Sequence, residues 1–384
     1  GVDALLTGPS RYLVLGANNA EMRAGGGMIL QVGPLEIVDG RFSAGDFQPT
    51  DVMQVAPGLV EVDPDVKTLW GALKPAEEWR NTNLTPRFDT TGELTSQMWE
   101  ALGGGEVTGV MAIDVPAIEA LLELTGPVTL DSGEVVSADQ VREDLLLGQY
   151  EDFEDRDARR DRLGELAGAV LDAIDNEGVS AAELIQVLRD MGARRHLMMW
   201  SSDSVQQAAW EELGTSGVPE ADSVLLSVMN RSANKLDPFQ AVTANMTTVP
   251  SEAGTRVGVE VTVTNNAPLG LPSYVAGPAD GTGLAEGEYR GIVSLTIPGA
   301  AGNVVSDGGT LVALGDDGPV RVAAREVRVP RGETVTVNFD FEFLEGWEGF
   351  TVLPSARVPS TEWSGPGGEW SDGRARRVEL ETGG

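Results

Sequence analysis

The chain has 384 residues, an apolar fraction of 41%, and 60 acidic against 27 basic residues, which gives a formal charge of -33. Its length exceeds the usual size of one hydrophobic core and predicts two or three domains, while the negative charge opposes phosphate backbones and argues against nucleic acid as a partner. The absence of cysteine and the presence of a single histidine argue against a disulfide scaffold, a thiol site or a protein-held metal site.

The beginning of the chain indicates where the protein works. No apolar run reaches the length of a membrane span, and no signal segment is present. The chain opens at Gly1, without an initiator methionine, shortly before an apolar run. We interpret it as the mature, water-soluble part of a secreted or membrane-anchored protein that has lost an upstream anchor. We therefore expect an extracytoplasmic location, with that anchor as the link to the membrane.

Strand-like and helical segments alternate through the first 245 residues. Short apolar runs predict buried strands at 11–16, 27–33 and 110–114. Apolar residues at helical spacing predict helices at 91–102, 116–124, 160–174 and 180–192. The alternation predicts an α/β domain over residues 1–245, with a central sheet covered by flanking helices.

From about residue 247, apolar and polar residues alternate in short runs that are interrupted by Gly, Pro, Asn and Asp. The alternating runs lie at 256–264, 289–298, 320–329 and 334–343. Period-two alternation in many short runs is typical of two packed antiparallel sheets. We therefore predict a C-terminal β-sandwich domain over residues 246–384.

The turn after the first predicted strand, residues 18–27, combines polar side chains with three glycines at its end. Glycines allow positive φ and close approach of a ligand, and α/β sheets place ligands at strand ends. The polar candidates for catalysis and substrate binding are Asn18, Asn19, Glu21 and Arg23. A tight polar turn without a function fits the same residues equally well, and the Gly-Lys-Ser/Thr ending of a P-loop is missing.

A second polar loop, residues 80–89, precedes the helix predicted at 91–102. Its candidate residues are Asn83, Arg87 and Asp89. Asp89 fits the N-cap of that helix. The functional interpretation pairs it with Glu21 instead, because two carboxylates across a cleft can serve as nucleophile and general acid in glycosyl transfer.

A third cluster is the charged run at 151–162. Such runs usually form a solvated helix face with paired charges. This one also holds the densest basic cluster of an acidic protein, in which Arg156, Arg159, Arg160 and Arg162 could hold an anion or a carboxylate. Asp157 lies in the same run and is a reserve catalytic carboxylate.

Two further groups are interpreted as structural. His196 lies beside an apolar run, where a structural histidine is the favoured interpretation. Lys235 occupies a polar turn and is expected to pair with Asp237 or to face the cleft. The tryptophans at 99, 200, 210, 347 and 370 could stack on sugar rings, but dispersed tryptophans usually belong to a core or an interface.

Several of these segments resemble, in order and spacing, a bacterial family called domain of unknown function 4012, which occurs in envelope proteins, especially of actinobacteria. The matching segments are 11–29, 83–89, 107–128, 147–163, 194–203 and 234–237. That family is distantly similar to the LytR-CpsA-Psr enzymes, α/β proteins that move glycopolymers from polyprenyl pyrophosphate carriers onto peptidoglycan. Where those enzymes carry Arg-Ser-Asp, this chain has Arg23-Ala24-Gly25, and an Ile-Pro-Arg-Asp segment is absent. The resemblance implies a LytR-CpsA-Psr-like central sheet and puts the pyrophosphate site in doubt.

The leading hypothesis is a glycoside hydrolase or transglycosylase that acts on a neutral cell-wall polysaccharide. The resemblance to actinobacterial proteins implies furanose polymers such as arabinan or arabinogalactan. Glu21 and Asp89 are its carboxylate pair, and no cofactor is required. Its substrate-binding residues are Asn18, Asn19, Arg23, Asn83, Arg87, Arg159 and Arg160.

Two alternatives belong to other classes. The first is a LytR-CpsA-Psr-like phosphotransferase, in which Arg23, Arg159 and Arg160 hold the pyrophosphate of a lipid-linked glycopolymer and a divalent cation such as Mg²⁺ assists. The second is an envelope scaffold without enzymatic activity, which binds glycan or protein through the β-sandwich.

Overall fold

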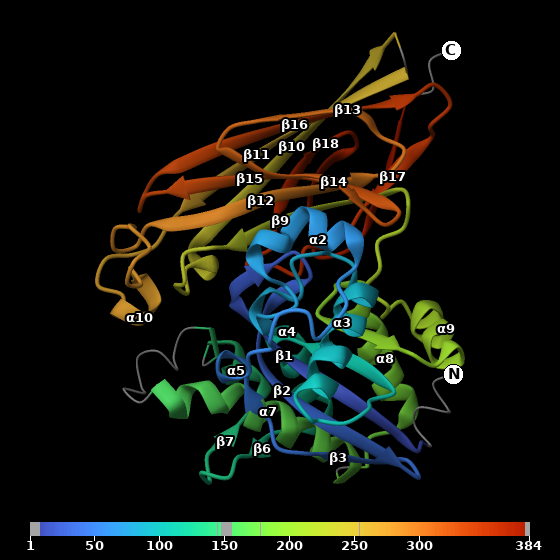
Figure 1. Ribbon diagram of the computed structural model, residues 1–384, viewed down its shortest axis with the longest axis vertical. Coiled ribbons are helices and arrows are strands. Elements are labelled where there is room, and N and C mark those ends of the chain that lie inside the picture. The colour runs from blue at the N-terminus through green and yellow to red at the C-terminus, as the bar shows by residue number, and fades with distance from the viewer. Residues whose placement is uncertain (1–7, 144, 147–155, 177, 253, 381–384) are drawn as a thin grey trace. The chain divides into compact units, whose positions relative to one another are not determined.

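The computed structural model describes residues 8–143, 145–146, 156–176, 178–252 and 254–380 (Figure 1). The chain forms two compact units that are interleaved along the sequence. Unit 1 comprises Gly1–Asn19, Gly25–Asp63 and Ala72–Val218, and unit 2 comprises Ala20–Ala24, Pro64–Gly71 and Pro219–Gly384. The domain boundary at 245 and 246 stays a prediction from sequence texture.

Unit 1 is built on a mixed sheet in the order β3-β2-β1-β5-β8, with β4 paired to β2. Its strands are β1 (Ser10–Arg23), β2 (Gly26–Val38), β3 (Arg41–Ala44), β4 (Gln48–Pro49), β5 (Gly109–Ile113) and β8 (Leu197–Ser201). The last residues of β1, from Ala20 on, belong to unit 2. Strands β1 and β5 run parallel, and β5 and β8 run antiparallel. Strands β6 (Val128–Thr129) and β7 (Val135–Val136) form a separate two-stranded sheet. The three strands predicted in this region therefore belong to one sheet.

The helices of unit 1 follow the predicted order along the chain. They are α3 (Phe88–Ala101), α4 (Val115–Thr125), α5 (Ala138–Glu143), α7 (Arg156–Asn176), α8 (Ala181–Ala193) and α9 (Ser204–Leu213). Short 3₁₀ turns lie at η1 (Thr50–Val52), η2 (Gly71–Leu73) and η3 (Trp79–Asn81). Helix α4 begins after Asp114, whose side chain accepts a hydrogen bond from the Ala117 amide, and α8 begins at a capping box formed by Ser180 and Glu183.

Strand alternation places the helices on both faces of the sheet. Leu13 of β1 and Val110 of β5 pack into a core with Met98 of α3. The neighbouring Tyr12 and Met111 point to the opposite face, where α4, α7 and α8 supply leucines and isoleucines. Unit 1 is thus a mixed sheet between two helical layers, which agrees with the predicted α/β class.

Unit 2 contains two six-stranded sheets, ordered β13-β16-β11-β10-β18-β19 and β14-β15-β12-β9-β17-β20. Its strands are β9 (Ser223–Asn230), β10 (Gln240–Ser251), β11 (Gly254–Asn265), β12 (Tyr289–Pro298), β13 (Gly302–Asp307), β14 (Thr310–Asp317), β15 (Val320–Val329), β16 (Thr334–Leu344), β17 (Gly349–Val352), β18 (Glu362–Gly365), β19 (Gly368–Ser371) and β20 (Arg376–Glu379). Its helical turns are α2 (Pro64–Trp70), α10 (Ser273–Ala276) and η5 (Asp237–Phe239). The four alternating runs lie in β11, β12, β15 and β16.

The core of unit 2 follows from the period-two alternation of its strands. Phe339, Phe341 and Phe343 of β16 are all buried, while the residues between them are partly exposed. The ring of Phe343 stacks on Phe350 of β17, which belongs to the other sheet, at a centroid distance of 5.8 Å. The sandwich topology itself stays a prediction.

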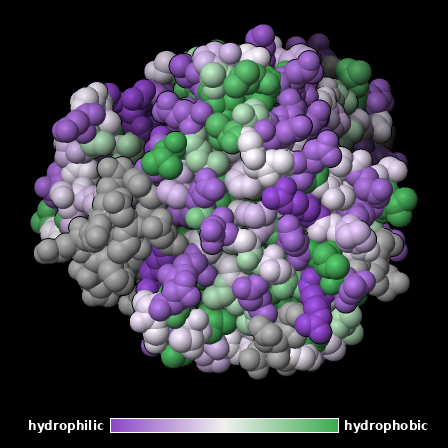
Figure 2. Space-filling model, turned by 60° about the horizontal axis from the view of Figure 1, so that its bottom comes forward, coloured by the Kyte–Doolittle hydropathy of each residue, from purple (hydrophilic) through white to green (hydrophobic). Residues whose placement is uncertain are grey.

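Among the described residues, no helix is both long enough and apolar enough to cross a membrane. On the face drawn in Figure 2, hydrophobic residues form small separated groups among hydrophilic ones.

Candidate functional site

A buried carboxylate, Asp114, lies at the carboxyl end of strand β5 in unit 1. Its Oδ1 accepts a hydrogen bond from the Ala117 amide at 3.2 Å. Its Oδ2 accepts a hydrogen bond from Asn19 Nδ2 at 2.8 Å and lies 2.7 Å from Nδ1 of His196. The Oδ1 atom of Asn19 in turn accepts from the Val115 amide at 3.2 Å. Because β1 and β5 are parallel neighbours, these groups gather at the edge where open sheets place ligands.

The position of His196, directly before β8, fixes the ring of the chain's single histidine. Its side chain is 12% exposed and that of Asp114 is 4% exposed. A carboxylate at Nδ1 favours the tautomer in which Nδ1–H donates to the carboxylate and Nε2 keeps its lone pair. The imidazole is therefore oriented as a proton acceptor.

A cavity of about 10 Å³ adjoins this cluster and is lined by Asn83, Asp114, Arg195, His196 and the glycines at 25–27. A volume of this order holds one oxygen-sized group such as a water molecule. The Nδ2 atom of Asn83 donates to the Gly27 carbonyl at 2.8 Å. Its Oδ1 is buried and has no hydrogen-bond partner in the described part of the chain. One of the residues that line the cavity thus has a buried acceptor that lacks a donor.

Arg195 and Gly27 both constrain the backbone around this cavity. Arg195 adopts a φ of 63° and donates to the carbonyls of Pro86 at 2.7 Å and Gly217 at 2.9 Å. Burial lowers the pKa of Arg195 to about 10, so its guanidinium remains charged at neutral pH. A Cβ at Gly27 would lie 2.6 Å from the carbonyl carbon of Asn18, which is too close for any residue but glycine.

The structure places two of the predicted substrate-binding residues in this cluster: Asn83 lines the cavity, and Asn19 donates to Asp114, which also lines it. It adds Asp114 and His196, which were not among the predicted site residues. The signal for Asp114 was its place between a buried strand and the Pro116 helix start, where sequence reasoning found only a strand end. The apolar run beside His196 favours a structural role. It does not reveal the carboxylate partner that follows another strand.

Arg87 and Asp89, also predicted, pair with each other. Arg87 Nη2 lies 3.1 Å from Asp89 Oδ2, and Arg87 Nη1 lies 3.3 Å from Asp63 Oδ2. The alternative in which Asp89 caps the helix is wrong, because α3 begins at Phe88 and has Arg87 at the N-cap without a side-chain cap. Asp89 instead lies in the first turn, where a negative charge interacts favourably with the helix dipole.

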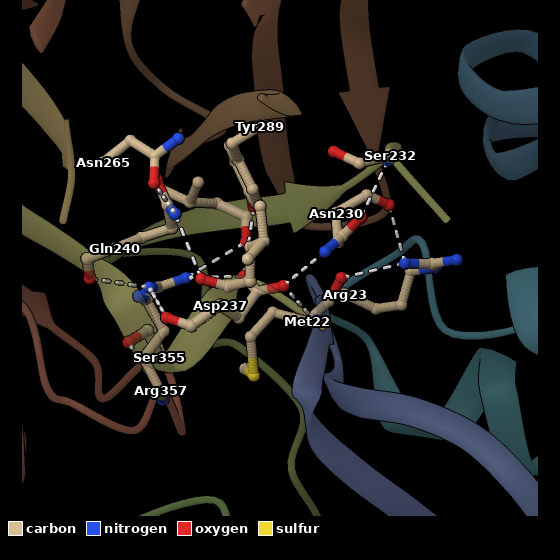
Figure 3. Close-up of polar contacts among 12 residues, drawn as sticks. Met22, Arg23, Asn230, Ser232, Asp237, Gln240, Asn265, Tyr289, Ser355 and Arg357 are labelled. Carbon is tan, nitrogen blue, oxygen red and sulfur yellow. Dashed lines mark hydrogen bonds and ion pairs between the residues drawn. The ribbon is translucent and has the colours of Figure 1, made fainter. Parts of the chain in front are cut away.

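Glu21 and Arg23 belong to the segment Ala20–Ala24 of unit 2. Glu21 forms a buried ion pair with Lys235. Arg23 Nη1 donates to the Asn230 carbonyl at 2.9 Å (Figure 3). Burial lowers the pKa of Lys235 to about 7. The expected pairing of Lys235 with Asp237 is therefore replaced by a pairing with Glu21.

Asp237 lies at the centre of a buried polar network in unit 2 (Figure 3). It accepts hydrogen bonds from Asn230 Nδ2 at 2.8 Å, Tyr289 Oη at 3.0 Å, Arg357 Nη1 at 3.2 Å and the Met22 amide at 3.3 Å. Burial raises the pKa of Asp237, against the opposing effects of Arg357 and the hydrogen bonds. Both carboxylate oxygens of Asp237 thus accept hydrogen bonds, and the network has the character of a structural core.

The remaining predicted residues fall in or near the charged run. Asn18 is buried. The side chains of Asp157, Arg159 and Arg160 lie outside the described residues, so their roles stay predictions. Arg162 is described: its Nη2 lies 2.6 Å from Glu134 Oε1, and this hydrogen bond lowers the pKa of Glu134. One arginine of the basic cluster therefore already has a carboxylate partner within unit 1.

A second cavity, of about 30 Å³, lies between the sheet of unit 1 and helices α4, α7 and α8. Its lining includes Tyr12, Met111, Leu121, Leu171, Leu188 and Met199, and contains no charged residue. The hydroxyl of Tyr12 is satisfied by Gln206 Oε1 at 2.6 Å and Trp210 Nε1 at 3.2 Å. The cavity therefore presents apolar surface to any guest.

Residues 7–150 match the family model of DUF4012, described as a protein of unknown function. The family resemblance is thereby confirmed for this part of the chain. The DUF4012 segment contains β1, β5, Asn19, Asn83 and Asp114, whereas His196 lies beyond it. No curated protein matches the chain.

The chain is also similar to several solved structures. They include a LytR-Csp2A-Psr enzyme from Actinomyces oris, at 14% identity over 54% of this chain and 76% of that chain, with a TM-score of 0.30. TagV from B. subtilis matches at 9% identity over 54% and 81%, with a TM-score of 0.29. Lin1025 from Listeria innocua matches at 11% identity over 55% and 79%, with a TM-score of 0.30. Scores at this level do not establish a shared fold.

Proposed function

We propose that unit 1 is a cell-envelope glycopolymer transferase of the LytR-CpsA-Psr type, which binds a lipid-linked glycan and transfers it to a hydroxyl group of the cell wall. The observation that carries this proposal is the polar cluster of Asn19, Asp114 and His196, which lies at the sheet edge where α/β folds bind ligands. The apolar cavity beneath α4, α7 and α8, at about 30 Å³, has room for a methyl-sized group and not for a whole lipid chain. The chain of a carrier-linked donor, which gains about 0.8 kcal/mol for each CH₂ buried, would have to part the apolar side chains that line this cavity.

The polar cluster and the apolar cavity belong to the same unit. Asp114 lies at the carboxyl end of β5, His196 lies directly before β8, and Asn19 of β1 donates to Asp114. The order of motifs in the DUF4012 segment supports the same reading, through its resemblance to the LytR-CpsA-Psr enzymes. An enzyme of this type acts outside the cytoplasm on cell-wall polysaccharide, which agrees with the expected location.

The carboxylate-pair hydrolase receives less support from the contacts. Glu21 is paired with Lys235 in unit 2, and Asp89 is paired with Arg87 in unit 1. A nucleophile and a general acid flank one glycosidic bond, whereas each of these two carboxylates is engaged with a different basic residue. Arabinan or arabinogalactan as the substrate stays a prediction from the resemblance.

A divalent cation is not required by the described residues. They contain no group of three acidic or histidine side chains that could hold a metal ion. Both carboxylate oxygens of Asp114 already accept hydrogen bonds. The residues that the structure describes therefore do not by themselves form a metal site.

The test measures transfer and lipid binding separately. We expect the protein to move glycan from a synthetic polyprenyl-pyrophosphoryl donor onto peptidoglycan, with the product detected by mass spectrometry. Leu188→Phe, which places a larger side chain at the apolar cavity, should weaken donor binding about tenfold or more. The control is the same change at the exposed Leu59, which should leave binding unchanged. Absence of transfer, together with equal lipid affinity of both variants, would reject the proposal.

A further inference from the structure

We propose that His196 and Asp114 form a catalytic dyad, in which His196 removes the proton of the attacking hydroxyl and Asp114 positions the ring. This inference rests on the proposed function and deepens it, because it names the group that activates the acceptor. His196 is the catalytic residue, since its Nε2 would touch the reacting oxygen. Asp114 and Asn19 act through the ring and are positioning residues.

The hydrogen bonds of Asp114 exceed what a helix cap requires. A cap needs one carboxylate oxygen, and Oδ1 fills that role with the Ala117 amide. The second oxygen is shared by Asn19 Nδ2 and His196 Nδ1, and Asn19 is itself held by the Val115 amide. Three elements, β1, α4 and the start of β8, thus fix one imidazole edge. Such rigid support is the arrangement by which a carboxylate orients a histidine base.

The cavity beside the ring provides a place for the nucleophile. It holds one oxygen-sized group and is lined by both members of the dyad. Asn83 is among the lining residues, and its buried Oδ1 has no hydrogen-bond partner in the described part of the chain. A buried acceptor without a donor costs about 1–3 kcal/mol, which an O–H group seated in the cavity would recover. The cavity is therefore suited to a hydroxyl group.

The proposed step balances as follows. The acceptor oxygen forms a bond to the phosphorus that carries the glycan, and the hydroxyl proton moves to His196 Nε2. The bond from this phosphorus to the bridging oxygen breaks, and its electron pair leaves with polyprenyl phosphate. The ring then carries a positive charge beside the Asp114 carboxylate and returns its proton to solvent. No oxidant, reductant or further reactant is needed.

The kinetic test compares His196→Gln and Asp114→Asn with the unchanged protein in the glycan-transfer assay. Loss of a general base typically lowers the rate about 10²–10⁴-fold, so we expect kcat to fall by this factor in His196→Gln while KM for the donor stays unchanged. Imidazole added to His196→Ala should restore part of kcat, which a structural role would not produce. The control is Asp190→Asn on α8, whose carboxylate pairs with Arg194 at the surface.

A spectroscopic test is independent of activity. The chain has one histidine, so ¹⁵N NMR of labelled protein reports this ring alone. We expect a protonated Nδ1 and a bare Nε2 in the neutral ring, and a loss of this preference in Asp114→Asn. A protonated Nε2 in the neutral ring would overturn the dyad whether or not transfer occurs. Transfer with a normal kcat in His196→Gln would overturn the dyad and leave the proposed function intact. A wild-type protein that never transfers glycan would refute both the proposed function and the role of the dyad in it.

Discussion

Removal of the Arg357 side chain tests whether the polar network of unit 2 is essential for its stability. Both partners of the Arg357–Asp237 pair are buried, at 1% and 0% side-chain exposure. Deleting one partner of a buried pair leaves an uncompensated charge and typically costs about 3–5 kcal/mol. Asn230, Tyr289 and the Met22 amide still donate to Asp237, so we expect Arg357→Met to lose about 3 kcal/mol of unfolding free energy at pH 7.

The same variant predicts a direction for the pH dependence. Burial raises the pKa of Asp237 above its unfolded value, so the folded chain holds this proton more tightly and stability falls as pH rises through the interval between the two values. Without Arg357 that pKa rises further. The deficit of Arg357→Met should therefore shrink on acidification from pH 7.

Urea unfolding at several pH values measures this deficit, and hydrogen exchange in peptides from β9 and β12 assigns it to unit 2. The matched control is Arg377→Met, which removes an exposed partner of Asp222 and should cost at most about 1 kcal/mol. A deficit of Arg357→Met below about 1 kcal/mol, or one that is independent of pH, would refute the reasoning.

Two further predictions concern Lys235 and the turn glycines. Burial lowers the pKa of Lys235 to about 7, so above that pH the unfolded chain binds more protons than the folded chain. The free energy of unfolding should therefore rise between pH 7 and 9, by at most about 1.4 kcal/mol per pH unit. Urea unfolding midpoints should lose this contribution in the double variant Glu21→Gln, Lys235→Met. Gly27→Ala should destabilise unit 1 by about 1–3 kcal/mol through its clash with the Asn18 backbone, as measured by thermal unfolding, whereas Gly373→Ala, which meets no atom within 4 Å, should leave stability unchanged.

The strands and helices of unit 1 were predictable because their apolar residues recur with regular periods. The parallel pairing of β1 with β5 determines which polar residues meet, and no local pattern specifies it. Likewise, β1 was expected to end at Gly16 but continues to Arg23, because the polar residues after Gly16 are paired in the sheet and buried. Local composition suggested a loop there, and tertiary contacts override that suggestion.

The candidate site shows the same limit. Asn19 and Asn83 were selected because polar residues near glycines often bind ligands, and both contribute to the cavity cluster. Glu21 was selected on the same grounds but lies in a buried pair with Lys235, a residue more than two hundred positions away. The sequence cannot show which of two neighbouring polar residues faces a cavity and which faces a core, because both choices satisfy the same local pattern.

The interleaving of the two units affects which fragments of the chain can fold and the order in which the parts of unit 2 are synthesised. The chain passes from one unit to the other after Asn19, Ala24, Asp63, Gly71 and Val218. A fragment that starts at Pro219 would lack Glu21 and the Met22 amide, and so would leave Lys235 and Asp237 each short of a partner. During synthesis, residues 20–24 leave the ribosome early, whereas residues 219–384 of the same unit are made last. Expression of unit 2 alone would therefore require a rearranged gene that fuses the segments 20–24 and 64–71 to residues 219–384.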